Sequence, residues 1–265
     1  LLLEYVCHTS RNDLLVHGEQ PVAPEAEEKY LNWIRQRAEH IPLQQLTGEQ
    51  GFMGLTFSVN EHVLIPRQDT EILVEEVLKE LHDGMRVLDM CTGSGCILLS
   101  LLHYSNDCEG LGVDLSAEAL EVAGRNVLKV LTPEKAEHAH FLQSDLFEKV
   151  EGKFEIIVSN PPYIASAEVE KLMPEVRDHE PRMALDGTED GLYFYRRIIE
   201  EAGKHLVSSG MLFFEIGYDQ GQAVSELMRT EGYCDVQVVQ DYAGLDRVVF
   251  GTYVTVQPAP FAKSR

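Results

Sequence analysis

The spacing of apolar residues changes along the chain and divides it into three parts. Residues 1 to about 50 carry apolar positions at helical spacing, and 25–40 predicts one amphipathic helix. Glycine-punctuated apolar residues over 51–66 predict a short β-hairpin. A further helix is expected to begin near Asp69 or Thr70, either of which can cap it. We therefore expect a small helical domain over 1–50, a hairpin linker over 51–68 and a larger domain over 69–265.

The larger domain alternates strand and helix patterns. Strands are expected at 86–90, 111–114, 139–144, 154–159 and 211–216, with helical patterns between most of them. Such alternation predicts a parallel sheet covered by helices on both faces. The last two strands, 236–240 and 247–252, are joined by a short turn and should be antiparallel. The expected fold is α/β and Rossmann-like, with a mainly parallel sheet ending in an antiparallel hairpin, which is the layout of class I methyltransferases.

Composition narrows the possible partners and the compartment. The 265 residues include 22 basic and 44 acidic ones, a formal charge of −22, so broad attraction to nucleic acid or anionic lipid is not expected. No apolar run approaches the length of a membrane span, about 20 residues. The five cysteines are an odd number without a C-x-x-C pair, which favours a reducing, cytoplasmic location. His138 and His140 lack neighbouring ligands and are expected to be surface residues, so we predict no metal site.

A glycine turn follows the first strand of the larger domain. Glycines allow the backbone to approach a ligand at the carboxyl end of a strand. Asp89, at the end of that strand, suits a cationic amino group better than a pyrophosphate. A third glycine, typical of dinucleotide sites, is absent. The candidate cofactor contacts in this segment are Asp89, Cys91, Thr92, Gly93, Ser94 and Gly95.

Acidic residues also end the next two strands. Asp114 follows the glycine turn by about 20 residues, the position that binds ribose hydroxyls in dinucleotide folds. The alternative is that Asp114 only caps the following helix. Asp145 can accept from an adenine amino group and Leu146 can cover the ring; the alternative is an ordinary loop aspartate, and the position of Asp145 in this series of strand ends favours ligand contact. Together these positions predict an S-adenosylmethionine site.

The fourth strand of this series runs directly into Asn160-Pro161-Pro162-Tyr163. Proline fixes the backbone, so the carbonyl groups before it are held rigidly. The Asn160 side-chain oxygen and the Pro161 carbonyl can accept both N–H groups of a planar amide or amino nitrogen and orient it for methylation. Tyr163 is expected to supply a stacking face. The tetrapeptide is the candidate substrate site, with Asn160, Pro161 and Tyr163 as catalytic residues; an ordinary Asn-Pro turn is the alternative.

Four further segments resemble the release-factor glutamine N5-methyltransferases of the HemK/PrmC type. They are LIPRQDTE at 64–71, EVRDHEPRMALDG at 175–187, FEIG at 214–217 and PLQQLTG at 42–48 in the N-terminal helical domain. The resemblance covers nearly the whole chain. Two departures are visible: Cys91 stands where the family usually has the first glycine of the loop, and Gln68 stands where it usually has proline.

The resemblance implies methylation of the glutamine in the Gly-Gly-Gln loop of class I peptide chain release factors, with S-adenosylhomocysteine as the second product. It implies cofactor contacts at Asp89, 91–95, Asp114, Leu146 and Asn160, and substrate contacts at 160–163. The N-terminal domain and the 64–71 hinge are expected to recognise the substrate protein. The charged residues at 67–71 and 177–182 are expected to tie the hinge to the loop after the tetrapeptide, with partner contact secondary.

Two other functions remain open from the residues. An adenine N6 methyltransferase acting on DNA or RNA also uses N-P-P-Y, but it predicts a basic groove, whereas this chain is acidic. A non-catalytic adaptor that kept the fold and binds a release factor is the second alternative. We expect a monomer that contacts neither nucleic acid nor a membrane directly.

Overall fold

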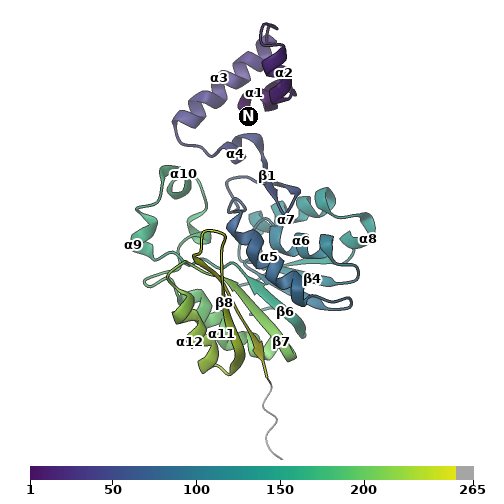
Figure 1. Ribbon diagram of the computed structural model, residues 1–265, viewed down its shortest axis with the longest axis vertical. Helices are drawn as coiled ribbons and strands as arrows, with labels where there is room; N and C mark the ends of the chain where they lie inside the picture. Colours follow the sequence, from purple (N-terminus) through teal and green to yellow (C-terminus); the bar gives the residue numbers. More distant parts are fainter. Residues whose placement is uncertain (255–265) are drawn as a thin grey trace, which may run out of the picture.

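The computed structural model describes residues 1–254, and its first part is helical. The helices are α1 (Leu2–Cys7), α2 (Arg11–Val16), α3 (Pro24–Ala38) and α4 (Leu43–Thr47). The amphipathic helix predicted over 25–40 is α3, and its proline occupies the first turn, where a missing N–H costs nothing. Ser10 and Asp13 form a capping box at the start of α2. Figure 1 shows these helices at one end of the molecule.

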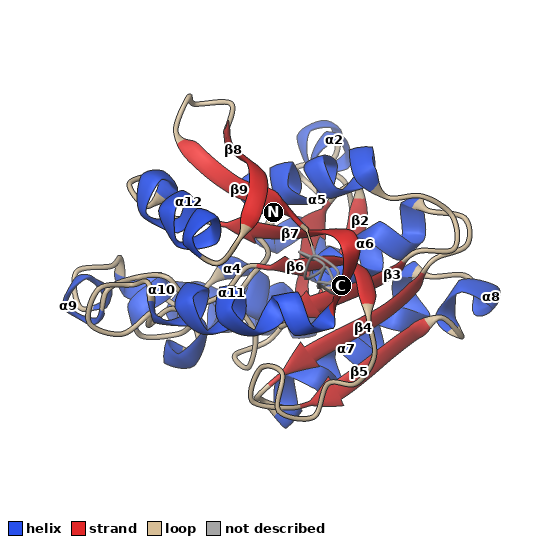
Figure 2. Ribbon diagram, turned by 90° about the horizontal axis from the view of Figure 1, so that it is seen from below, coloured by secondary structure: helices blue, strands red, loops and turns tan. Residues whose placement is uncertain are grey.

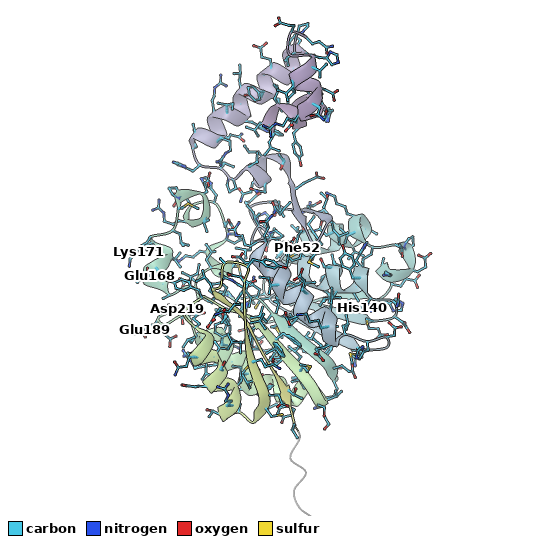
Figure 3. The ribbon with its side chains drawn as sticks, viewed as in Figure 1. Phe52, His140, Glu168, Lys171, Glu189 and Asp219 are labelled. Atoms are coloured by element: carbon cyan, nitrogen blue, oxygen red, sulfur yellow. The ribbon has the colours of Figure 1, made fainter. Side chains whose placement is uncertain are left out.

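A β-hairpin leads from the helices to the larger domain. It consists of β1 (Glu49–Phe52) and β2 (Leu55–Ser58), paired antiparallel. Phe52 and Phe57 are buried, with ring centroids 6.0 Å apart, and Figure 3 shows Phe52 where the hairpin meets the larger domain. The hairpin is shorter than predicted because a turn follows it, in which the Asn60 side chain accepts from the His62 amide at 3.0 Å.

The next helix, α5 (Asp69–Glu80), begins where the sequence predicts but lacks the predicted cap. Gln68 occupies the cap position and makes no capping hydrogen bond through its side chain. Asp69 and Thr70 both lie within the first turn, so the prediction that one of them caps the helix is wrong. Thr70 is buried instead, and its hydroxyl takes part in the functional site.

A seven-stranded sheet forms the centre of the larger domain. Its strands are β3 (Arg86–Met90), β4 (Glu109–Asp114), β5 (Ala139–Gln143), β6 (Phe154–Ser159), β7 (Leu206–Glu215), β8 (Tyr233–Gln240) and β9 (Asp246–Tyr253). They lie in the order β5-β4-β3-β6-β7-β9-β8. The first five in this order are parallel, and β9 runs antiparallel to both β7 and β8. The predicted α/β class, with its closing antiparallel hairpin, is confirmed.

Helices cover both faces of the sheet (Figures 1 and 2). One core cluster joins the sheet to α5, α6 (Cys96–Tyr104) and α7 (Ala117–Val130). The other joins it to α11 (Tyr193–His205) and α12 (Gly221–Thr230). Burial on both faces explains the nearly continuous apolar sequences of β3 and β6. The short helix α8 (Pro133–Ala136) follows α7 at the edge of this layer.

The loop after β6 projects toward the helical domain (Figure 1). It contains α9 (Ser166–Val169), α10 (Pro174–Arg177) and a 3-10 turn (Arg182–Ala184). Arg37 pairs with Glu175, and the Gln45 side-chain amide donates to the His179 carbonyl at 2.7 Å. On the outside of the loop, Glu168 and Lys171 pair at 2.6 Å (Figure 3). Within residues 1–254, no helix is both long and apolar enough to cross a membrane.

Candidate active site

A cavity of about 210 Å³ lies at the carboxyl ends of the parallel strands. The ends of β3, β4 and β6 are aligned in the sheet, since Met90 lies opposite both Val113 and Ser159. The predicted site residues that line the cavity are Cys91, Thr92, Gly93, Ser94, Asp114, Asp145, Leu146, Asn160 and Pro162. Four others do not line it: Asp89, Gly95, Pro161 and Tyr163. The structure thus gathers most of the candidates from four separate strand ends.

The glycine turn between β3 and α6 owes its shape to three left-handed residues. Cys91, Gly93 and Gly95 have φ of 64°, 55° and 77°. A Cβ on Gly93 would meet nothing within 4 Å, so this glycine leaves open space beside the cavity. A Cβ on Gly95 would approach Ala123 and Leu99 to 3.2 Å. Gly95 therefore serves helix packing, while Gly93 keeps the wall open.

Asp114 at the end of β4 holds the turn in place. Its Oδ2 accepts from the Gly93 amide and its Oδ1 from the Ser116 amide, both at 2.9 Å. Ser116, not Asp114, caps α7, through a bond from the Ala119 amide at 3.0 Å. Burial raises the pKa of the Asp114 carboxyl. Because Asp114 lines the cavity as well, its carboxylate is placed to receive ribose hydroxyls.

Asp145 and Leu146 form the wall beyond β5. Asp145 accepts from Arg197 at 2.9 Å, and the same guanidinium lies 5.7 Å from the ring centroid of Tyr193. Leu146 is buried and adopts a positive φ of 48°. The ion pair fixes the carboxylate beside an apolar surface, an arrangement suited to the amino edge and the face of an adenine ring.

Asp89 does not line the cavity, but it hydrogen-bonds to Thr92, which does. Its Oδ2 accepts from the Thr92 hydroxyl at 2.6 Å and from the Leu98 amide at 3.3 Å. Its Oδ1 is buried and has no hydrogen-bond partner within residues 1–254. Burial, and to a smaller extent the charge of Asp114, raise the pKa of Asp89 to about 7. The structure therefore shows no direct route from Asp89 to a ligand, but an anionic Asp89 attracts a cation across Thr92.

Asn160 presents its side chain to the cavity from the end of β6. The strand end is fixed by Ser159, whose hydroxyl donates to the Met90 carbonyl at 2.6 Å. The Asn160 side-chain NH₂ points toward the Thr70 hydroxyl at 3.5 Å. Because an amide has one donor end and one acceptor end, this contact favours the carbonyl oxygen facing away from Thr70.

Tyr163 does not line the cavity, although its position in the tetrapeptide predicts that it would; its side chain contacts Glu215 instead. Its hydroxyl donates to the Glu215 carboxylate at 3.2 Å, and its main-chain carbonyl accepts from Gln220 at 3.0 Å. Burial, followed by the charge of Glu215, raises the pKa of the Tyr163 hydroxyl well above its ordinary range. The expected stacking face in the cavity is not seen; the aromatic lining residue is Phe194, on α11.

Several residues that complete the site were not among the predicted cofactor or substrate contacts. Arg67 lines the cavity and pairs with buried Glu180, which also accepts from the Ile65 amide at 3.3 Å. This pairing supports the structural role expected for the charges around the hinge. Asn126, fully buried on α7, accepts from the Ser58 amide and donates to the carbonyls of Ser58 and Ser94. It therefore joins the hairpin to the glycine turn.

The donor set fits S-adenosylmethionine. The Asp114 carboxylate can accept hydrogen bonds from ribose hydroxyls. The Asp145 carboxylate can accept from the adenine amino group, and Leu146 provides an apolar surface for the ring. The unpartnered buried oxygen of Asp89 adds negative charge that suits a cationic ligand. Within residues 1–254 the structure contains no group of three or more His, Cys, Asp or Glu side chains arranged to hold a metal ion. The fold and this cavity define a class I methyltransferase.

Comparisons with known proteins identify the family. Residues 67–176 match the methyltransferase small domain and residues 1–48 match the PrmC N-terminal domain. The release factor glutamine methyltransferase of Clostridium acetobutylicum is 42% identical over 94% of this chain and 88% of its own length. That of Moorella thermoacetica is 44% identical over 93% and 87%. The chain belongs to the release factor glutamine methyltransferase family, and its methyl donor is S-adenosylmethionine.

A solved structure supports the fold independently. A methyltransferase from Pyrococcus furiosus superposes with a TM-score of 0.56 at 17% identity, covering 83% of this chain and 99% of that one. At this identity the likeness concerns the fold alone.

Proposed function

We propose that this chain methylates the side-chain amide nitrogen, N5, of the glutamine in the Gly-Gly-Gln motif of class I peptide chain release factors. The observation that carries the proposal is the position of Asn160, whose side chain faces the cavity while its NH₂ group points to Thr70. The names of the relatives, release factor glutamine methyltransferase, give the substrate class.

The chemistry requires orientation of a poor nucleophile. A carboxamide nitrogen shares its lone pair with the carbonyl, so its reactivity depends on alignment and on acceptors for its protons. We assign these acceptors to the Asn160 side-chain oxygen and the Pro161 carbonyl. Pro162 lines the cavity beside them, and Tyr163 supports the substrate site by fixing the end of the tetrapeptide through its bonds with Glu215 and Gln220. S-adenosylmethionine supplies a methyl group on a positively charged sulfur and leaves as S-adenosylhomocysteine.

The same proposal assigns the cofactor contacts. Direct contacts are assigned to 91–94, Asp114, Asp145, Leu146 and Asn160, since all of these line the cavity. Asp89 acts by its charge, and Gly95 by letting α6 approach α7. The helical domain and its hinge are assigned to recognition of the release factor. We expect the chain to act as a monomer in the cytoplasm, without direct contact to nucleic acid or membrane, in keeping with its charge of −22.

The experiment compares two acceptors. Purified protein is incubated with methyl-labelled S-adenosylmethionine and either a class I release factor or double-stranded DNA, and the Gly-Gly-Gln peptide is then analysed by mass spectrometry. One added methyl group on the glutamine is expected. Label in DNA but not in protein would instead support the adenine methyltransferase.

A matched pair of variants tests the assigned residue. Asn160→Ala is expected to abolish methyl transfer while S-adenosylhomocysteine binding is largely retained, because the other assigned cofactor contacts remain. Asn60→Ala, which removes an asparagine in the turn after the hairpin, should keep wild-type turnover. No methylation even by the wild-type protein, with release factor still bound, would support the non-catalytic adaptor.

A further inference from the structure

A buried polar chain lies beside Asn160, and its first member, Thr70, also lines the cavity. Asn160 donates toward the Thr70 hydroxyl at 3.5 Å, and Thr70 is only 2% exposed. Beyond Thr70 lies Glu215, at the end of β7, also 2% exposed. Thr70 makes no hydrogen bond to this carboxylate at standard geometry within residues 1–254, but its hydroxyl lowers the pKa of the Glu215 carboxyl, which is the effect of a nearby donor. The three side chains come from α5, β6 and β7, so only the folded protein brings them together.

Hydrogen-bond chemistry gives this chain a direction. An ionised carboxylate only accepts, a hydroxyl has one proton to give, and an amide has distinct donor and acceptor ends. A Thr70 hydroxyl that donates to Glu215 offers its lone pairs to Asn160. The Asn160 NH₂ then faces Thr70, and its oxygen faces the cavity. The opposite orientation would present NH₂ to the substrate amide, which also offers N–H groups.

The surroundings of Glu215 keep it available as an acceptor. Tyr163 donates to its Oε1 at 3.2 Å, whereas Oε2 is buried and has no partner at hydrogen-bonding geometry within residues 1–254. Burial raises the pKa of this carboxyl, while Thr70, Arg247 and Tyr163 lower it and Asp69 raises it further. Arg247 itself lies 3.5 Å from Asp69 and 3.1 Å from Asp241. Glu215 therefore has the cation Arg247 and the hydroxyl groups of Thr70 and Tyr163 in its surroundings.

We propose that Thr70 and Glu215 are positioning residues that orient the Asn160 carboxamide, so that its oxygen, and not its nitrogen, meets the substrate glutamine. The inference rests on the proposed function, because it concerns the same nitrogen. It also gives a buried threonine on α5 and a buried glutamate on β7 a role in turnover that acts through Asn160.

Three variants test the direction of the chain. Thr70→Val keeps the shape but removes the hydroxyl, and it should lower kcat by about a hundredfold through misorientation. Thr70→Ser restores the hydroxyl and should remain within about threefold of wild type. Glu215→Gln offers an NH₂ to Thr70, which allows the chain to reverse, and should lower kcat at least tenfold. In all three, the Kd for S-adenosylhomocysteine and the KM for release factor should stay within about threefold of wild type.

Ser225→Ala is the matched control, since it removes a buried hydroxyl on α12 outside this chain, and it should leave kcat unchanged. Thermal unfolding of each variant establishes that it is folded. If Thr70→Val does not fold, the comparison of Glu215→Gln with Thr70→Ser decides the question.

Wild-type kcat in folded Thr70→Val or Glu215→Gln would overturn the proposal. A Thr70→Ser loss as large as that of Thr70→Val would also overturn it, because packing rather than the hydroxyl would then matter. Failure of the wild-type protein to methylate release factor would instead refute the proposed function, so the two failures are distinguishable.

Discussion

Cys91 carries a backbone conformation that glycine adopts more easily. Its φ is 64°, and a left-handed residue with a Cβ costs roughly 1–2 kcal/mol. Burial raises the pKa of its thiol well above the ordinary value, so the thiol stays protonated despite its position in the cavity wall. The cysteine therefore carries a conformational cost and shows no sign of nucleophilic activation.

Two substitutions at Cys91 separate backbone strain from loss of the thiol. Cys91→Gly and Cys91→Ala both remove sulfur, but only glycine relieves the positive φ. We expect Cys91→Gly to be more stable than Cys91→Ala by about 1 kcal/mol in urea unfolding, with methyl transfer in both close to wild type. Equal stabilities would show that the turn absorbs the strain, and loss of activity in both would point to a chemical role for the thiol.

Asp89 should make cofactor binding depend on pH. Its pKa is raised to about 7 by burial, so the carboxyl is largely neutral below this pH and charged above it. A cationic ligand group favours the charged form, and binding should therefore weaken as pH falls from 7.5 to 5.5, by up to roughly tenfold per pH unit below 7. Calorimetric titration with S-adenosylhomocysteine, whose amino group is cationic in this range, measures the effect.

The same carboxyl affects stability with the opposite trend. Because its folded pKa lies above the ordinary aspartate value of 3.8, the folded state holds the proton more tightly, and stability is lost as pH rises from about 4 toward 7. Asp89→Asn should remove both trends, giving weaker but nearly pH-independent binding. A binding curve for Asp89→Asn as steep as that of wild type would assign the titration to another group.

At the scale of elements, the tetrapeptide is held from outside by a glycine loop. Gly191 has φ of 73°, and a Cβ there would overlap the Tyr163 carbonyl. Gln220 donates to the carbonyls of both residues, at 3.0 Å from Tyr163 and 3.4 Å from Gly191. The loop before α11 therefore sets the position of the chain that leaves the active site.

Gly191→Ala should disturb the tetrapeptide directly. We expect a loss of about 2 to 4 kcal/mol in stability, from the strained φ and the steric overlap, together with reduced turnover. Gly124→Ala is the control: this exposed glycine lies on α7 with nothing within 4 Å, and alanine should stabilise the helix by roughly 0.5–1 kcal/mol. Thermal unfolding and methyl transfer are measured on both. Equal behaviour of the two variants would contradict this account of the loop.

Strands with a short, mostly apolar sequence are predictable from the sequence alone. The strands at 86–90 and 154–159 have the predicted bounds, because each is an apolar run bounded by polar or turn residues. Because the carboxyl ends of parallel strands lie at one edge of the sheet, the sequence predicts that Asp114 and Asn160 lie near one another. The general location of the site therefore follows from local pattern and sheet topology.

The side-chain contacts between distant parts of the sequence could not be predicted in this way. Thr70 and Asn160 are 90 positions apart, and Asn126 bonds to Ser58 across 68. In the sequence, Thr70 has the properties of a helix cap and Asn126 those of an exposed helix residue. Their burial depends on how α5 and α7 rotate against the sheet, which local propensity does not determine. The direction of the Tyr163 ring depends on Glu215 for the same reason.

At the scale of the whole molecule, the loop after β6 links the helical domain to the cavity. Arg37 pairs with Glu175, and Gln45 donates to the His179 carbonyl at 2.7 Å. A few residues further, Pro181 and Asp186 line the cavity. The chain thus passes from contact with the helical domain into the active-site wall within about ten residues, so this loop connects the two directly.

Removing the two contacts together should weaken use of the whole protein substrate. For Arg37→Ala/Gln45→Ala we expect kcat/KM for release factor to fall by up to about thirtyfold, mainly through KM, since the two hydrogen bonds contribute roughly 1 kcal/mol each. S-adenosylhomocysteine binding should not change. A short Gly-Gly-Gln peptide, too small to reach the helical domain from the cavity, should be methylated at the wild-type rate.

Arg35→Ala is the control for this prediction, because Arg35 lies on the same helix and makes no side-chain hydrogen bond or ion pair with any residue in 1–254. It should behave as wild type with both substrates, unless its own charge contacts the release factor. If the double variant loses activity equally on peptide and protein, the contacts stabilise the cavity wall itself. If it loses activity on neither, the helical domain is positioned by the hairpin alone, through the buried pair Phe52 and Phe57. Only a loss confined to the whole release factor supports a helical domain that presents the protein substrate to an already formed active site.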